Sequence, residues 1–166
     1  MAPCEGKFRP EAGAFRLVPG REIAGAGPAL AKQAACRYIA AMPNYLLVMI
    51  GGAIGAALRF EVGRVALHRI GAGFPWGTLI VNLVGGLLMG ILAGYMFTRN
   101  PPDQSLWLFV GVGLLGGFTT FSAFSFDLFS MLERGQLATA SLYAGLSLFG
   151  SVALLFAGFW LARTAT

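Results

Sequence analysis

Four long apolar stretches dominate the chain from residue 45 onward, separated by short polar or Gly/Pro-containing segments. They cover about residues 45–67, 76–97, 106–132 and 137–162. Each can cross a bilayer, because a transmembrane helix needs about 20 mostly apolar residues. The connections are short, so neighbouring spans run antiparallel. The pattern therefore predicts an all-α membrane protein with four transmembrane helices.

Composition supports a membrane protein and leaves little room for enzymatic chemistry. The chain is 57% hydrophobic and 11% charged, whereas soluble domains average about 25% charged. Its 24 glycines include Gly86, Gly90 and Gly94 at four-residue spacing, which predicts a groove for close helix packing. Cys4, Cys36 and the single His68 form no metal-binding or catalytic pattern. We expect neither an enzyme nor a nucleic-acid-binding protein.

Residues 1–41 differ from the rest, with charged residues and proline but no long apolar run. We interpret them as a disordered extension, or as upstream sequence if translation starts at Met42. Beyond residue 41, the cations flanking the spans are nearly balanced, with Arg99 and Arg163 on one side and Arg64, Arg69 and Arg134 on the other. Such balance gives no insertion preference, so two copies could pair in opposite orientations. If residues 1–41 are present, their six cations add to the side with Arg99 and Arg163, and this side is then expected to be cytoplasmic.

Polar side chains in the second and fourth spans fall on single helix faces. Thr78 and Asn82 are four residues apart. On this span alone we favour an interhelical hydrogen bond for Asn82, with a wet path as the alternative. Tyr143, Ser147 and Ser151 form a stripe of hydroxyls that either bond to their own helix or line a path. Two such stripes predict a polar track through the bundle.

The third span contains a run that is unfavourable for a continuous helix, Gly116-Gly117 followed by Thr119-Thr120. We predict a break there near the bilayer centre. Its freed carbonyls would suit a small hard cation. Phe121 and Phe124 follow, interleaved with Ser122. The two rings are either apolar filling or, through their positive edges, part of a site for a small anion.

At these residues the sequence resembles the Fluc/CrcB family of fluoride channels. Three blocks carry the resemblance: residues 51–60 (GGAIGAALRF), residues 77–82 (GTLIVN) and residues 116–125 (GGFTTFSAFS). Together they extend over about residues 45–163 in the family's order. The resemblance implies a dual-topology antiparallel homodimer with two fluoride pores and a structural Na⁺ at the dimer interface.

The resemblance also implies roles for individual residues. Backbone carbonyls of Gly116 and Thr119 would bind Na⁺. The expected fluoride pore consists of Asn82, Phe121, Phe124, Ser151, Tyr143, Thr78 and Ser122. Arg59 would draw anions into the vestibule, and Asp127 would lie at the pore end. Two positions depart from the family's pattern: Ala123 replaces its usual Thr, and Asp127 its usual Glu.

We therefore expect a passive channel in the bacterial inner membrane that exports fluoride and lowers its toxicity. Its partners would be the fluoride ion, a second copy and the lipid bilayer. One alternative is a small proton-coupled exporter of dual topology, for which Glu61 and Asp127 are the titratable candidates. The other is a membrane subunit that transports nothing.

Overall fold

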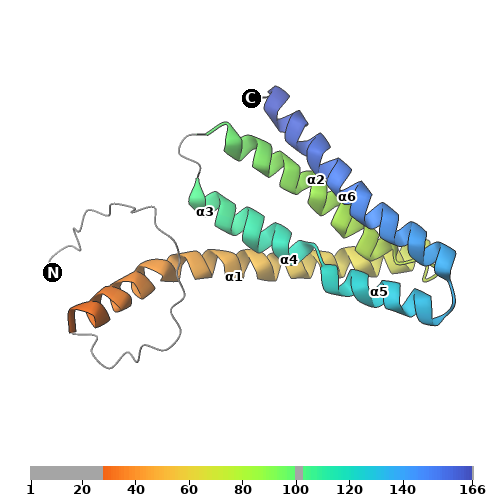
Figure 1. Cartoon of the computed structure of the whole chain (residues 1–166), viewed down its shortest axis with the longest axis horizontal. Helices are drawn as coiled ribbons and strands as arrows, with labels where there is room; N and C mark the ends of the chain where they lie inside the picture. Colours follow the sequence, from red (N-terminus) through yellow and green to blue (C-terminus); the bar gives the residue numbers. More distant parts are fainter. Residues whose placement is uncertain (1–27, 100–102, 166) are drawn as a thin grey trace, which may run out of the picture. The chain divides into compact units, whose positions relative to one another are not determined.

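The computed structural model describes residues 28–99 and 103–165, with side chains from residue 43 onward. All secondary structure in these ranges is helical, in the order α1 (Pro28–Ile70), α2 (Trp76–Phe97), α3 (Gln104–Leu106), η1 (Trp107–Leu115), α4 (Gly116–Phe118), α5 (Phe121–Glu133) and α6 (Leu137–Ala165) (Figure 1). The description below concerns the unit that begins at Ile39.

Four segments are long and apolar enough to cross a membrane, as predicted. They are Pro43–Ile70, Trp76–Phe97, Gln104–Glu133 and Leu137–Ala165. Their bounds differ from the predicted ones by only a few residues at each end. Residues 1–27 lie outside those described, and residues 28–41 are the start of α1. The interpretation of residues 1–41 as an extension or an upstream sequence stays a prediction.

Local chemistry explains where several helices begin and end. The Asp103 side chain accepts hydrogen bonds from the backbone N–H groups of Ser105 (3.0 Å) and Leu106 (3.1 Å), which starts the third span. Gly71, with φ 103°, follows α1, and Gly135, with φ 71°, follows the end of α5. Glycine adopts this left-handed conformation without steric cost, so both positions allow a sharp turn into the next helix.

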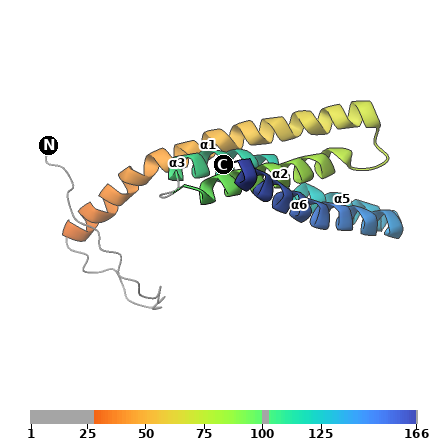
Figure 2. The same cartoon turned by 90° about the horizontal axis from the view of Figure 1, so that it is seen from above.

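Glycine also sets how closely the helices approach. A side chain at Gly86 would meet the Ser151 carbonyl oxygen at 2.6 Å, and one at Gly90 would meet the Leu155 carbonyl. Helices α2 and α6 consequently run side by side with their backbones in close contact (Figures 1 and 2). On α1, a side chain at Gly51 or Gly55 would overlap the backbone of η1. These contacts confirm the predicted close helix packing.

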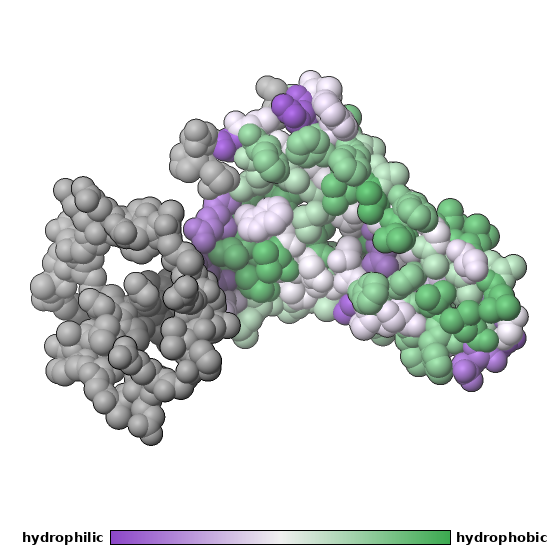
Figure 3. Space-filling model, in the orientation of Figure 1, coloured by the Kyte–Doolittle hydropathy of each residue, from purple (hydrophilic) through white to green (hydrophobic). Residues whose placement is uncertain are grey.

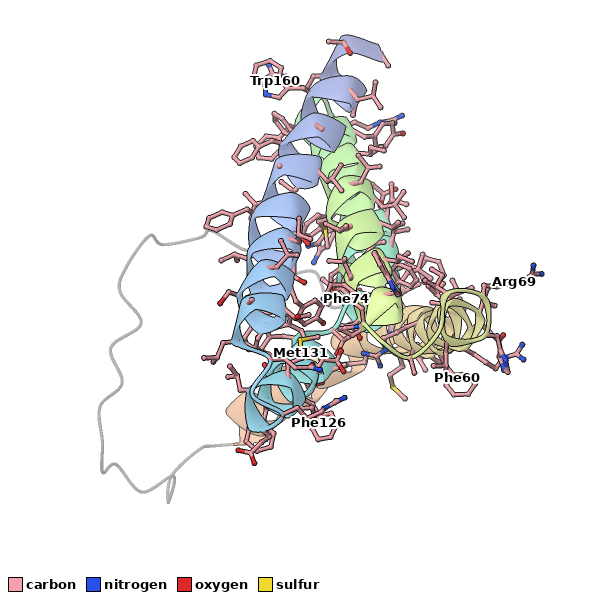
Figure 4. The ribbon with its side chains drawn as sticks, turned by 90° about the vertical axis from the view of Figure 1, so that its right-hand side faces the viewer. Phe60, Arg69, Phe74, Phe126, Met131 and Trp160 are labelled. Atoms are coloured by element: carbon pink, nitrogen blue, oxygen red, sulfur yellow. The ribbon has the colours of Figure 1, made fainter. Side chains whose placement is uncertain are left out.

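The buried core is small. Leu79, Met131, Ala140 and Tyr143 form a cluster where α2, α5 and α6 meet, with Phe74 packed against it. In Figure 4, Phe74 and Met131 lie in this region, whereas Phe60 and Trp160 point outward. Large apolar side chains are exposed along all four spans, and Figure 3 shows mostly hydrophobic residues on the face in view. Such a surface is suited to lipid or to another membrane-embedded chain.

Candidate functional site

The third span is interrupted at two residues. Thr119 (φ −77°, ψ 158°) and Thr120 (φ −151°, ψ 124°) are extended, and α4 and α5 lie on either side. The two glycines before them remain helical. The helix is therefore interrupted within the expected run, at its threonines; a break near the bilayer centre stays a prediction.

Asn82 of α2 holds the interruption in place. Its Nδ2 donates to the Thr120 carbonyl oxygen at 3.2 Å, and its Oδ1 accepts from the Thr120 backbone N–H at 3.0 Å. The amide thus satisfies both backbone groups of a buried extended residue. This geometry agrees with the interhelical hydrogen bond favoured for Asn82, and it leaves one Nδ2 hydrogen for another acceptor.

The interruption also redirects the hydrogen-bond donors that would pair with two carbonyls. In a continuous helix, the Gly116 carbonyl would accept from the Thr120 N–H, which instead donates to Asn82. The Thr119 carbonyl would accept from the Ala123 N–H, which instead donates to Thr120 Oγ1 at 3.2 Å. Both carbonyls predicted to bind a cation have therefore lost their helical donors. Oxygen atoms in this state suit a hard cation such as Na⁺.

A cavity beside the interruption gathers several of the predicted pore residues. We call it the serine cavity; it measures about 350 Å³. Its lining includes Asn82, Thr119, Thr120, Phe121, Phe124, Ser147 and Ser151. The Ser147 and Ser151 hydroxyl oxygens are buried and have no hydrogen-bond partner among the described residues. Buried polar atoms normally have a hydrogen-bond partner, so these hydroxyls are available to bond to a solute that enters the cavity.

A row of aromatic rings continues from this cavity. The ring centroids of Phe121 and Phe124 are 5.7 Å apart, and those of Phe124 and Tyr143 are 5.2 Å apart. Phe74 then meets Tyr143 edge to face at 5.5 Å. Phe121 is 79% exposed, so its own chain covers little of its ring. The Ser122 side chain instead lies 3.2 Å from Thr120 Oγ1, and Ser122 does not line the serine cavity.

A second cavity, also about 350 Å³, lies beneath the turn between α1 and α2 and the turn between α5 and α6. We call it the loop cavity. Thr78, a predicted pore residue, and Asp127, predicted at the pore end, line it together with Phe74, Ser130, Arg134 and Gln136. The residues that line the two cavities differ, so Thr78 and Asn82 belong to different sites despite their spacing.

Tyr143 lies between the two cavities. Its side chain is fully buried, and its hydroxyl donates to Asp127 Oδ2 at 3.2 Å. Phe124, on the serine cavity, packs on one part of the ring, and Phe74, on the loop cavity, packs on another. Tyr143 thus contacts lining residues of both the serine cavity and the loop cavity.

The structure does not bring Arg59 to this site, since it lines neither cavity. Several residues that do line them were absent from the predicted site, among them Ser147 and Arg134. Ser147 was visible in the hydroxyl stripe of the fourth span but was not counted as a pore residue. Arg134 follows α5, and its spacing to the other residues gave no signal.

Four apolar helices with donor-lined cavities among them define a small multi-pass membrane protein. A family model described as "CrcB-like protein, Camphor Resistance (CrcB)" matches residues 46–159. The chain belongs to this Fluc/CrcB family, as the resemblance predicted.

Curated relatives agree with the family match. The chain is 50% identical over 123 residues to the "Fluoride-specific ion channel FluC" of Hyphomonas neptunium, covering 74% of this chain and 97% of the relative. The protein of the same name from Erythrobacter litoralis is 50% identical over 71% of this chain and 90% of its own length. The one from Sphingopyxis alaskensis is 49% identical over 74% and 97%, respectively.

Proposed function

We propose that this chain is a fluoride-specific passive channel that exports fluoride from the bacterial cytoplasm across the inner membrane. The observation that carries the proposal is the pair of buried, unpartnered hydroxyls of Ser147 and Ser151 in the serine cavity. The names of the relatives, which share about half of the aligned residues, point in the same direction.

The chemistry of the serine cavity suits fluoride. This ion is small and strongly hydrated, so a selective path must replace its water with hydrogen-bond donors at short range. Ser147 and Ser151 offer hydroxyls, and Asn82 offers its remaining Nδ2 hydrogen. The edges of the Phe121 and Phe124 rings carry partial positive charge. Among the described residues, the cavity lining carries no charged side chain, which favours binding weak enough for release.

Passive export would be enough for detoxification. Hydrogen fluoride crosses membranes as a neutral molecule and dissociates in the cytoplasm. The trapped anion then leaves down its own gradient through a channel, and no energy source is required.

We infer that the working unit is an antiparallel homodimer of dual topology. Phe121 is largely uncovered by its own chain, although its ring lies beside the serine cavity. A second copy would complete the walls around it. The near balance of the flanking cations beyond residue 41 is consistent with insertion in both orientations.

The Gly116 and Thr119 carbonyls would hold a structural Na⁺ at the dimer interface, near the bilayer centre. Two carbonyls from one chain do not complete the coordination of a hard cation, whereas two copies would supply four. Gly116 is exposed on its own chain, as a shared site requires. When bound, the ion would offset the partial negative charge of these carbonyl oxygens.

Fluoride efflux from liposomes containing the purified protein tests this function. The vesicles are loaded with fluoride or chloride in Na⁺ buffer, valinomycin and K⁺ compensate charge, and the pH is equal on both sides. A passive fluoride channel releases fluoride quickly under these conditions and retains chloride. Fluoride release that requires a pH gradient would support the proton-coupled exporter, and no release would support a subunit without transport activity. Either outcome would refute the proposal.

Nothing in the geometry favours the exporter. Glu61 forms an exposed ion pair with Arg64 at 2.7 Å on α1, and Asp127 accepts the Tyr143 hydrogen bond. Neither carboxylate lines the serine cavity.

A further inference from the structure

The loop cavity contains a cation that has no part in the predicted site. Arg134 lines this cavity together with Gln136, Thr78 and Asp127. Arg59, the residue expected to attract anions, does not line it. Among the described residues on this lining, Arg134 is the one cationic side chain and Asp127 the one anionic side chain.

The turn after α5 fixes the position of Arg134. Gly135 has φ 71°, and its backbone N–H donates to the Leu132 carbonyl at 2.9 Å. The Gln136 N–H donates to the Met131 carbonyl at 3.0 Å. These bonds close the last turn of α5 and hold the Arg134 backbone at its end.

The guanidinium group is also anchored. Arg134 Nε donates to the Ser130 carbonyl oxygen at 3.0 Å, and Ser130 lines the same cavity. This bond uses one of the five N–H groups of arginine and leaves the terminal Nη hydrogens for a solute. Arg134 is exposed, so an anion held there stays in contact with water and can leave again.

The other arginines near the loop cavity, Arg64 and Arg69, differ from Arg134 in their pairing and position. Arg64 is paired with Glu61 at 2.7 Å, which offsets its charge. Arg69, at the end of α1, is exposed and does not line the loop cavity; Figure 4 shows its side chain extending away from the bundle. Arg134 is therefore the cation placed to act on an ion inside the cavity.

Asp127 places a negative charge on the same lining, so an anion entering the loop cavity needs a nearby cation to offset the repulsion. Its carboxylate accepts the Tyr143 hydrogen bond and also borders the loop cavity. A carboxylate repels fluoride on its way towards Tyr143 and the serine cavity. A guanidinium in the same cavity offsets that repulsion and raises the local anion concentration.

We propose that the loop cavity is the aqueous entrance to the serine cavity, and that Arg134 is the residue that concentrates fluoride there. This inference rests on the proposed channel function. Thr78 and Gln136 supply further donors on the same lining. Arg134 acts by attraction from exposed solvent, so its effect depends on ionic strength.

The test compares three variants in the liposome assay at low fluoride, where entry limits the flux. Arg134→Gln removes the charge and Arg134→Lys keeps it. Arg69→Gln is the matched control, because it removes the same charge close to the cavity but off its lining. Choline methanesulfonate varies the ionic strength from about 0.01 to about 1 M, which shortens the Debye length from about 30 Å to about 3 Å at constant Na⁺.

At low ionic strength, we expect Arg134→Gln to lower the initial fluoride flux by roughly threefold, whereas Arg134→Lys and Arg69→Gln remain close to the wild type. At high ionic strength, the difference between Arg134→Gln and the wild type should disappear, because screening removes the attraction in both. Wild-type flux should itself fall as salt is added, a measurement that needs no variant.

Three results would overturn the inference. The first is equal flux for Arg134→Gln and the wild type at low ionic strength. The second is a loss that persists at high salt and is not restored by lysine, which would indicate a structural role. In both cases the wild-type protein still conducts, so the proposed channel function stands. The third is a wild-type protein that conducts no fluoride, which overturns the channel function and the inference together.

Discussion

Asn82, Ser147 and Ser151 are polar residues within apolar helices, but their hydrogen bonding differs. Asn82 gives one donor and its acceptor to the Thr120 backbone. The serine hydroxyls have no hydrogen-bond partner in the part of the chain that the structure describes. Maintaining the interruption thus depends on Asn82, whereas the serines are available for a transported ion.

Replacing Asn82 by alanine should destabilise the fold. Asn82→Ala leaves the Thr120 N–H and C=O without their partner, and a buried group left unpaired costs about 1–3 kcal/mol. We expect a lower thermal unfolding midpoint in detergent, followed by tryptophan fluorescence. Asn44→Ala, the same change in α1, serves as the control and should shift the midpoint much less. Equal midpoints for Asn82→Ala and the wild type would show that Asn82 does not hold the interruption.

The sequence could predict which residues belong to the site better than it could predict which cavity each of them lines. The hydroxyl stripe of α6 and the Phe121–Phe124 pair were predicted, and the serine cavity brings together Ser151 and both rings. Thr78 and Asn82 share a helix face, but four residues of helix rise by about 6 Å. That rise is enough to place them in different cavities. Spacing along one helix cannot predict which residues of other helices close each cavity.

At the scale of elements, helix packing depends on glycines that face another backbone.

Hydropathy could predict all four spans because each contains a long apolar run. The π-helical turns of η1 (Trp107–Leu115) could not be predicted, since they arise within a run of ordinary apolar residues. The interruption falls at Thr119 and Thr120 because Asn82, on another helix, captures the Thr120 backbone. That contact is invisible to local propensity.

Two glycine substitutions separate packing from helix propensity. Gly90→Ala would place a methyl group against the Leu155 backbone, and overpacking of this kind costs about 1–3 kcal/mol. Gly145→Ala in α6 meets nothing within 4 Å, so it should gain about 0.5–1 kcal/mol from better helix propensity. Thermal unfolding should therefore shift in opposite directions. A midpoint for Gly90→Ala equal to or above that of the wild type would contradict the close α2–α6 contact.

For the whole molecule, the proposed assembly joins two chains around one cation. The large exposed apolar surface does not distinguish lipid from a second copy. The carbonyls of Gly116 and Thr119 do distinguish a second copy from lipid. If both chains use these carbonyls to bind one Na⁺, the stability of the dimer should depend on that ion. Such dependence is not expected of contacts made by apolar side chains alone.

Replacing Na⁺ should therefore weaken the dimer. In detergent with Na⁺ exchanged for the larger K⁺ or choline, we expect size-exclusion chromatography with light scattering to show more monomer at the same protein concentration. Thr119→Ser keeps the carbonyl ligand and should retain the dependence on Na⁺. A dimer of equal stability without Na⁺ would argue against the carbonyl site, while leaving the serine cavity as the conduction path.

The central claim is that fluoride passes through the serine cavity on the hydroxyls of Ser147 and Ser151. Fluoride efflux by the double variant Ser147→Ala/Ser151→Ala tests it most directly, with Ser141→Ala, an exposed serine of the same helix, as the control. A hydrogen bond to a charged group contributes about 1.5–3 kcal/mol, so we predict at least a roughly tenfold loss of flux. The unfolding midpoint should change little, since neither hydroxyl has a hydrogen-bond partner among the residues that the structure describes, and Ser141→Ala should conduct normally. Wild-type fluoride flux through the folded double variant would contradict the account.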